Sequence, residues 1–446
     1  MATVPSESGG PSLLSFLRGA RSLVQNPQST SPSAPQPILV VGNSSADLDS
    51  FACAILYAYF RSARSGSSQP YVPVVNVPFP SGPELCRQRP EFLAAIGPDA
   101  SGIEPGAAVR EIVTAKELKD SGILASSRSG KKLSGILVDW NVLPEPAPDA
   151  VGAGDFEVLG CIDHHADENF VPQHEQASTE ASHPRTIDTA AGSCASLVVQ
   201  ELRRTGLWPE SSPPTVDAEP IDEQTEHQLA RLALSAILID SANLTAKEKT
   251  SAVDISSAEF LVAKLSGSSF DREGFFNHIK SAKESGLNFL TVQEVLAKDY
   301  KEWGVDTTGT KLGIACVVRP LSWLVDKATA EKKDVDRGVA LVNELNEFAK
   351  SRGVDMLSVM TAFTAPETKR FSRELVLWSV NPRCDAMAEK FVKTAEDEAM
   401  GLDPWIDIPH LGTNEGEGAW RGAWTQGDTK KSRKQVAPLL RKAMES

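Results

Sequence analysis

Short apolar runs alternate with segments of helical periodicity through the first half of the chain, and this alternation restricts the possible folds more than any other feature. Four runs are typical of buried strands: residues 37–43 (PILVVGN), 71–77 (YVPVVNV), 134–140 (SGILVDW) and 156–165 (FEVLGCIDHH). The helical segments around them include residues 50–63, 194–206 and 227–240. Strands that alternate with helices predict a mostly parallel sheet with helices on both faces. The first half is therefore expected to form an α/β domain.

The length of the chain and a second set of strands indicate more than one domain. At 446 residues the chain exceeds the usual size of a single hydrophobic core. Strand-like runs return at residues 311–319, 355–364 and 373–380, and they predict a second, smaller α/β domain. The expected division is an N-terminal helix and flexible segment at 1–36, a first domain at 37–245, a helical linker at 246–289 and a second domain at 290–446.

Charge and composition argue against several classes of protein. The formal net charge of -14 disfavours a nucleic-acid-binding surface, because such surfaces carry a basic field. No apolar run approaches the roughly 18 to 20 residues that cross a bilayer, so no membrane association is expected. The six cysteines are scattered without a CxxC pair, as in reducing compartments, and the N-terminal residues lack a secretory signal. We expect a cytoplasmic protein, with a weak organelle-targeting signal as the open alternative.

Carboxylate and imidazole side chains gather where the predicted strands end. They are Asn43, Asp47 and Asp49 after the first strand, Asp139 after the third, Asp163, His164 and His165 after the fourth, and Asp240 at the end of helical segment 227–240. The carboxyl ends of parallel strands share one edge of a sheet, where carboxylates this close would repel one another unless cations were bound. Oxygen-rich ligands favour Mg²⁺ or Mn²⁺ over zinc, and two such ions suit hydrolysis of phosphoesters or phosphoanhydrides.

Four motifs in these regions carry a resemblance to a known superfamily. GNSSADLDS (42–50), LVDWN (137–141), CIDHHAD (161–167) and ILID (237–240) resemble, in this order, the motifs of the DHH phosphoesterases. The second half resembles their DHHA2 domain, with DYKEW at 299–303 and SRKQVAPLL at 432–440. The chain is most similar to the cytosolic exopolyphosphatases of fungi. Asn43 stands where family II inorganic pyrophosphatases have His, and His165 stands where prune-type phosphoesterases typically have Arg.

The resemblance implies a role for each residue of the predicted site. It assigns metal coordination to Asp47, Asp49, Asp139, His164 and Asp240. Asp139 would bridge two divalent ions, Mn²⁺ or Mg²⁺, with Co²⁺ as a further candidate. Asn43 would replace an imidazole ligand and coordinate weakly through its carbonyl oxygen or not at all. His165 would hydrogen-bond to the phosphate undergoing cleavage, and Asp163 would fix the adjacent backbone and His164.

The resemblance also implies a substrate and an activity. Lys301, Arg433 and Lys434 would be the phosphate-binding cations of the second domain. The implied function is an exopolyphosphatase that removes the terminal orthophosphate from linear inorganic polyphosphate. Apart from the resemblance, a monomer is the expected state. Two alternatives stay open. One is a pyrophosphatase or short-chain nucleotide phosphoesterase on the same scaffold, and the other is a protein that binds polyphosphate without turnover.

Overall fold

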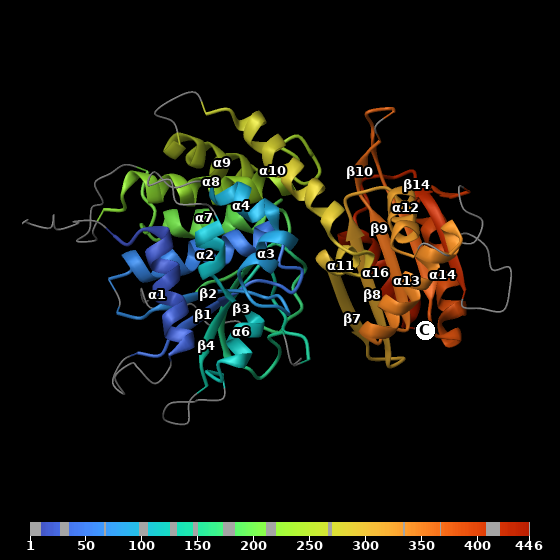
Figure 1. The fold of residues 1–446 in the computed structure, drawn as a ribbon, viewed down its shortest axis with the longest axis horizontal. Helices are drawn as coiled ribbons and strands as arrows, with labels where there is room; N and C mark the ends of the chain where they lie inside the picture. The colour runs from blue at the N-terminus through green and yellow to red at the C-terminus, as the bar shows by residue number, and fades with distance from the viewer. Residues whose placement is uncertain are drawn as a thin grey trace, which may run out of the picture. The chain divides into compact units, whose positions relative to one another are not determined.

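The computed structural model of the chain contains two compact units, Met1–Gly286 and Leu287–Ser446 (Figure 1). Each unit is described by itself. The structure describes residues 10–26, 35–66, 68–97, 106–124, 132–145, 150–172, 183–210, 220–265, 270–332, 335–365, 367–406 and 420–445. None of the helices within these ranges is long and apolar enough to cross a bilayer.

The first unit is built on a parallel sheet of six strands. They are β1 Ile38–Val41, β2 Tyr71–Val75, β3 Val113–Thr114, β4 Ser134–Val138, β5 Glu157–Asp163 and β6 Arg185–Ile187. The strand order is β3-β2-β1-β4-β5-β6, and every neighbouring pair is parallel. From β1 the chain adds β2 and β3 toward one edge of the sheet. It then returns to the middle and adds β4, β5 and β6 toward the other edge. Loops leave a crevice at such a switch point, beside the carboxyl ends of β1 and β4, and ligands bind there in sheets of this kind.

Helices cover both faces of this sheet. They are α1 Leu13–Gln25, α2 Leu48–Arg64, α3 Pro83–Gln88, α4 Pro90–Ile96, α5 Gly106–Glu111, α6 Ala115–Asp120, α7 Cys194–Arg204, α8 Glu223–Asp240, α9 Ala252–Leu265 and α10 Arg272–Gly286. Ile38 and Val40 of β1 join a core with α2, α7 and α8. Leu39 and Val41 point the other way and join a core with the end of α1 and with α6. Burial on both faces explains why the strands are continuous apolar runs.

The second unit has a mixed sheet of six strands and a short hairpin. The strands are β7 Tyr300–Val305, β8 Thr310–Val317, β9 Met356–Thr361, β12 Glu374–Ser379, β13 Leu402–Pro404 and β14 Arg421–Gln426, and the hairpin pairs β10 Phe363–Thr364 with β11 Phe371–Ser372. The sheet order is β13-β14-β12-β9-β8-β7. In this sheet β8 and β9 pair in parallel, and the other neighbours are antiparallel.

Helices also pack on both faces of the second sheet. They are η2 Leu287–Phe289, α11 Val292–Lys298, α12 Leu321–Glu331, α13 Arg337–Arg352, η3 Pro382–Cys384, α14 Asp385–Asp397 and α16 Arg433–Met444. The helices α11, α12 and α13 form one core with the sheet, and α14 and α16 form a second core on its opposite face. Residues from alternate positions of β7, β8 and β12 enter these two cores.

The predicted α/β fold class is confirmed in both units. The structure differs from the expectation for residues 246–289, where the sequence suggested a helical linker. Most of this segment forms α9 and α10, which belong to the first unit and pack against α8. The apolar side chains of Leu261 and Ile279 account for this placement, because both are fully buried in the core that contains α8.

Candidate metal centre

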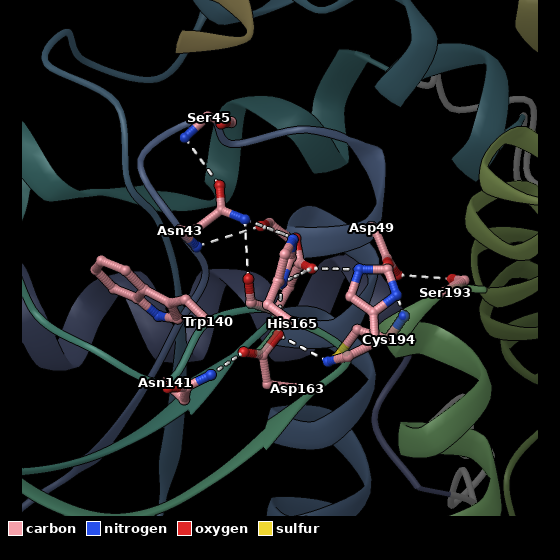
Figure 2. A network of polar contacts seen from close by, with 12 residues as sticks. Asn43, Ser45, Asp49, Trp140, Asn141, Asp163, His165, Ser193 and Cys194 are labelled. Atoms are coloured by element: carbon pink, nitrogen blue, oxygen red, sulfur yellow. Dashed lines mark hydrogen bonds and ion pairs between the residues drawn. The ribbon is translucent and has the colours of Figure 1, made fainter. Parts of the chain in front are cut away.

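Several predicted site residues of the first unit, among them Asn43, Asp49 and His165, lie together at the switch point of the sheet (Figure 2). Asn43 follows β1, Asp139 follows β4, and Asp163 is the last residue of β5. Because β1, β4 and β5 are parallel neighbours, the loops that follow them leave the sheet at the same edge. Parallel pairing therefore turns three segments that are distant in sequence into one site.

Asp139 lies at the centre of this site and is 1% exposed. Its Oδ2 accepts hydrogen bonds from Nδ2 of Asn43 and from the hydroxyl of Ser50, each at 2.7 Å. Its Oδ1 lies 3.3 Å from Nε2 of His164 and 3.7 Å from Nδ1 of His165. The φ angle of Asp139 is 63°, a left-handed conformation that Asp and Asn tolerate better than most residues. This turn aims the carboxylate into the crevice instead of continuing β4.

The histidine pair is oriented by Asp163, which is fully buried. Its Oδ1 accepts the backbone N–H of His164 at 2.8 Å and lies 2.7 Å from Nδ1 of His165. Nδ1 of His164 lies 3.3 Å from the carbonyl oxygen of Ala191. With its proton on Nδ1, His164 presents the lone pair of Nε2 toward Asp139, as a metal-binding imidazole does. Asp163 thus holds the backbone of His164 and the ring of His165, and its role in the reaction stays a prediction.

Asp49 is held by the start of α7. Its carboxylate accepts the hydroxyl of Ser193 at 2.9 Å and the backbone N–H groups of Cys194 and Ala195 at 2.7 and 2.8 Å (Figure 2). The helix α7 begins at Cys194, so its partial positive charge supports the carboxylate. Nε2 of His164 lies 3.9 Å from Oδ2 of Asp49. These contacts direct Asp49 toward the histidine that also faces Asp139.

Two further carboxylates complete the group. Asp47 is the N-cap of α2, where it accepts the backbone N–H of Ser50 at 3.1 Å, and Asp240 is the last residue of α8. Burial raises the pKa of the Asp49 carboxyl well above its usual range. The negative charges of Asp240, Asp139 and Asp47 raise this pKa further. The four carboxylates therefore lie close enough to repel one another.

The donors of this group fit a divalent cation. Asp139, His164 and His165 each offer a ligand atom within 4.8 Å of the others. Carboxylate oxygens with one or two imidazole nitrogens are donors suited to Mg²⁺ and Mn²⁺. A bound cation would also offset the repulsion that raises the pKa of Asp49. The chemistry of the donors and their mutual repulsion both indicate a metal centre.

Asn43 is buried beside this centre and contacts Asp139 through its amide nitrogen. Nδ2 donates to both the carboxylate and the backbone carbonyl of Asp139, at 2.7 and 3.0 Å. The amide oxygen accepts the backbone N–H of Ser45 at 2.8 Å. In this arrangement Asn43 positions Asp139. Its predicted role as a ligand through the carbonyl oxygen stays a prediction.

Sequence reasoning missed several residues that support the metal centre. Ser50 and Asn141 lie inside the recognised motifs, and each donates to a site carboxylate, Ser50 to Asp139 and Asn141 to Asp163. A search of the motifs for hydroxyl and amide donors would have found both. Ser193 donates to Asp49 from 144 positions away in the sequence, and no local pattern marks that contact.

Asp254, in α9, organises the loop that holds Asp49 and was also missed. It is fully buried and accepts five hydrogen bonds. The donors are the backbone N–H groups of Gly192, Ser193 and Ser251 and the hydroxyls of Ser196 and Ser251, at 2.6 to 3.3 Å. Asp254 therefore fixes the chain just before α7, whose first N–H groups bind Asp49.

We expect the substitution Asp254→Ala to lower the free energy of unfolding by about 3 kcal/mol, because several buried donors lose their acceptor. Urea denaturation of the purified variant measures this loss. Asp271→Ala is the matched control, since Asp271 is an exposed carboxylate that accepts the N–H of Gly274 at the start of α10. The control should lose only about 1 kcal/mol, the usual cost of removing an N-cap. Equal losses in the two variants would contradict the role assigned to Asp254.

The second unit matches a known protein family. Residues 277–443 match the family model described as the DHHA2 domain. The chain carries a DHHA2 domain. This domain begins within α10 and includes every strand of the second sheet. The resemblance that the motifs at 299–303 and 432–440 indicated is therefore confirmed for this part of the chain.

Proteins similar over nearly the whole chain are known. A Schizosaccharomyces pombe protein named "Putative exopolyphosphatase" is 28% identical over 431 residues, which cover 95% of this chain and 96% of that protein. "Exopolyphosphatase PRUNE1" of Rattus norvegicus is 25% identical over 407 residues, covering 91% of this chain and 75% of that protein. The crystal structure of a Methanococcus jannaschii protein, titled "putative family II inorganic pyrophosphatase", matches with a TM-score of 0.52 and 20% identity. The match covers 92% of this chain and 100% of that chain, and it shows a likeness in fold.

The three cations predicted to bind phosphate all lie in the DHHA2 domain. Lys301 is half-buried on β7, and Lys434 is exposed in the first turn of α16. Arg433 is the first residue of α16. Its Nη1 donates to the carbonyl oxygen of Asp299 at 3.0 Å, and its Nη2 lies 2.7 Å from Oδ1 of the same residue. Asp299 therefore balances part of the Arg433 charge, which the sequence did not indicate.

Proposed function

We propose that this protein is an exopolyphosphatase, which hydrolyses the terminal phosphoanhydride bond of linear inorganic polyphosphate and releases orthophosphate. The observation that carries the proposal is the position of Asp139, whose Oδ1 faces both His164 and His165 at the switch point of a parallel sheet. The named exopolyphosphatases among its relatives support the choice of substrate, since the similarity extends over 91 to 95% of the chain.

The residues of the first unit fit two divalent ions in this proposal, Mn²⁺ or Mg²⁺. We assign their coordination to Asp47, Asp49, Asp139, His164 and Asp240, which would hold the ions at the switch point of the sheet. When bound, such ions lower the pKa of water and neutralise phosphoryl oxygens. Asn43 and Ser50 hold the Asp139 carboxylate in one orientation through their two 2.7 Å hydrogen bonds. This pre-organisation avoids reorientation of the carboxylate during the reaction.

His165 is assigned to the phosphate that is cleaved. Its side chain is 28% exposed, whereas that of His164 is 6% exposed, so His165 is the imidazole that a substrate can reach. Nδ1 of His165 donates a hydrogen bond to Asp163, which fixes the orientation of the ring. The ring so held is positioned to contact a phosphoryl oxygen, where negative charge accumulates as the bond breaks.

Lys301, Arg433 and Lys434 are assigned to the polyphosphate chain. Each phosphate unit of the chain is negatively charged, while the protein has a net charge of -14, so binding requires local positive charge. Arg433 also stands at the N-terminus of α16, where backbone N–H groups favour anions. The DHHA2 domain thus supplies cations for substrate binding, and the first unit supplies the groups that act on the terminal phosphate.

The proposal is tested by measuring orthophosphate release from three substrates: long-chain polyphosphate, tripolyphosphate and pyrophosphate. Each assay is run with Mn²⁺, with Mg²⁺ and with a chelator. We expect release from long chains and from tripolyphosphate that requires metal, with much slower release from pyrophosphate. Preferential cleavage of pyrophosphate would show a pyrophosphatase instead. Absence of release from all three substrates at saturating metal, with polyphosphate still bound, would show a non-catalytic binding protein.

A further inference from the structure

Arg373 of the DHHA2 domain lies at the end of the sheet that also carries Lys301, one of the predicted phosphate-binding cations. Pairing registers place the residues of this end across neighbouring strands. Tyr300 pairs with Ala315, Cys316 pairs with Met360, and Met360 pairs with Leu375. Arg373 precedes β12 and continues its ladder, since its carbonyl oxygen accepts the N–H of Gln426 at 2.9 Å. Lys301 pairs with Ile314, two positions before Cys316. Arg373 lies two positions from Leu375, which shares a row with Cys316 through Met360. Lys301, Cys316 and Arg373 therefore step diagonally across this end of the sheet, in three successive rows.

Side-chain alternation puts these three residues on the face of the sheet that α16 covers. Trp303, Ile314 and Leu375 all belong to the core that includes α16. Lys301, Cys316 and Arg373 each lie two positions from one of these residues, so they share the same face. The Nε–H of Arg373 donates to the carbonyl oxygen of Thr429 at 2.8 Å, in the turn that leads to α16. Arg373 is thereby tied to the segment that presents Arg433 and Lys434.

Arg373 has no acidic partner among the residues that the structure describes, in contrast to Arg433. It is 8% exposed, and its contacts within the described ranges are the Thr429 carbonyl and the ring of Phe371, 5.0 Å away. No carboxylate in those ranges forms an ion pair with it, whereas Arg433 is paired with Asp299. Burial lowers the pKa of Arg373. A nearly buried guanidinium without a counter-charge is costly and is normally balanced by a partner or a ligand.

Three cations of this face act electrostatically on the thiol of Cys316. Burial raises the pKa of the Cys316 thiol to about 11, and the positive charges of Arg433, Arg373 and Lys301 oppose this increase. Among the described residues, the thiol therefore experiences the positive charges of these three cations and the negative charge of Asp299. The local charge around Cys316 is positive in a chain whose net charge is strongly negative. Such a cluster is suited to a multiply charged anion.

We infer that Arg373 is a further phosphate-binding residue and that, with Lys301 and Arg433, it holds a phosphate unit of the polyphosphate chain. This inference deepens the proposed function and rests on it for the identity of the polyanion. The Nε–H of Arg373 is already engaged by the carbonyl oxygen of Thr429. Its two Nη groups are separate donors and can form two parallel hydrogen bonds to one phosphate. The bound phosphate supplies the counter-charge that Arg373 lacks among its protein neighbours.

The test measures binding of tripolyphosphate to the full-length protein by calorimetry in the presence of a chelator, so that no turnover occurs. The variants are Arg373→Gln and Arg373→Lys. Arg337→Gln is the matched control, because Arg337 is an exposed arginine of α13 that pairs with Asp326 and lies on the helices of the opposite face. We expect Arg373→Gln to weaken binding by about tenfold, the loss of charge-assisted hydrogen bonds. Arg373→Lys should weaken binding less, because it keeps the charge without the paired donors. The control should bind as the parent does.

The outcomes separate this inference from the proposed function. Parental affinity and parental salt dependence in a folded Arg373→Gln variant would overturn the inference, even if the parent hydrolyses polyphosphate. If Arg373→Gln does not fold, Arg373→Lys decides, and unchanged tripolyphosphate affinity in that variant overturns the inference. The parent could also release no phosphate from any chain while these variants still bind tripolyphosphate more weakly. This result would support the phosphate site at Arg373 and contradict the proposed catalytic function.

Discussion

The substitution Asp139→Asn is expected to lower the rate of phosphate release by about 1,000-fold or more, the largest effect expected of any single change in this protein. Asp139 is the carboxylate that faces both histidines, with its Oδ1 at 3.3 Å from His164 Nε2. An amide at this position is neutral and cannot balance the charge of a cation shared between the carboxylates. Initial rates of orthophosphate release at saturating Mn²⁺ measure the effect.

The fold should survive this substitution for two reasons. Asn tolerates the left-handed backbone conformation of residue 139, where φ is 63°. An amide oxygen can also still accept the hydrogen bonds that Asn43 and Ser50 donate. Asp120→Asn is the matched control, since Asp120 is an exposed carboxylate at the end of α6 that pairs with Lys116. The control should keep parental activity. An Asp139→Asn rate within tenfold of the parent would exclude a shared ligand at this position.

Removal of divalent metal is expected to abolish hydrolysis and to lower the unfolding midpoint of the first unit by about 5 to 10 °C. Metal at 100 times its dissociation constant stabilises a protein by about 2.7 kcal/mol, and this free energy sets the size of the shift. The physical source is the group of mutually repelling carboxylates, in which burial and then Asp240, Asp139 and Asp47 raise the pKa of Asp49. Calorimetric scans with Mn²⁺, with Mg²⁺ and with a chelator measure the midpoint.

The variant Asp49→Asn shows whether the metal acts through this group. Asp49 accepts three hydrogen bonds at the start of α7, and an amide cannot accept all of them while also serving as an anionic ligand. Its midpoint should be lower than that of the parent with metal, and it should change little when metal is removed. A parent whose midpoint is the same with metal and with chelator would refute the metal centre. A full metal-dependent shift in Asp49→Asn would exclude Asp49 as a ligand.

Much of this protein was predictable because strong local patterns survive folding unchanged. The strand at 38–41 is buried on both faces, so it is apolar at every position and is recognisable without any partner. The carboxylates and imidazoles that follow the strands were predictable as a group for a similar reason. Parallel strands necessarily bring their carboxyl ends to one edge, so a pattern of strands and strand-end residues already implies a shared site.

The contacts that orient those residues were decided by tertiary structure alone. The hydrogen bond from Ser193 to Asp49 joins residues 144 positions apart in the sequence. The hydrogen bond from the N–H of Gly192 to Asp254 joins residues 62 positions apart. Helix α9 was expected in a linker, but its apolar side chains pack in the hydrophobic core of the first unit. Arg373 has no local motif, and its significance comes from the strands beside it and from the absence of an acidic partner among its described neighbours. Residue types and their periodicity determine which elements form and what chemistry they carry, because those depend on local propensity and burial. Packing decides which buried groups meet, because hydrogen bonds and charges act only over short distances.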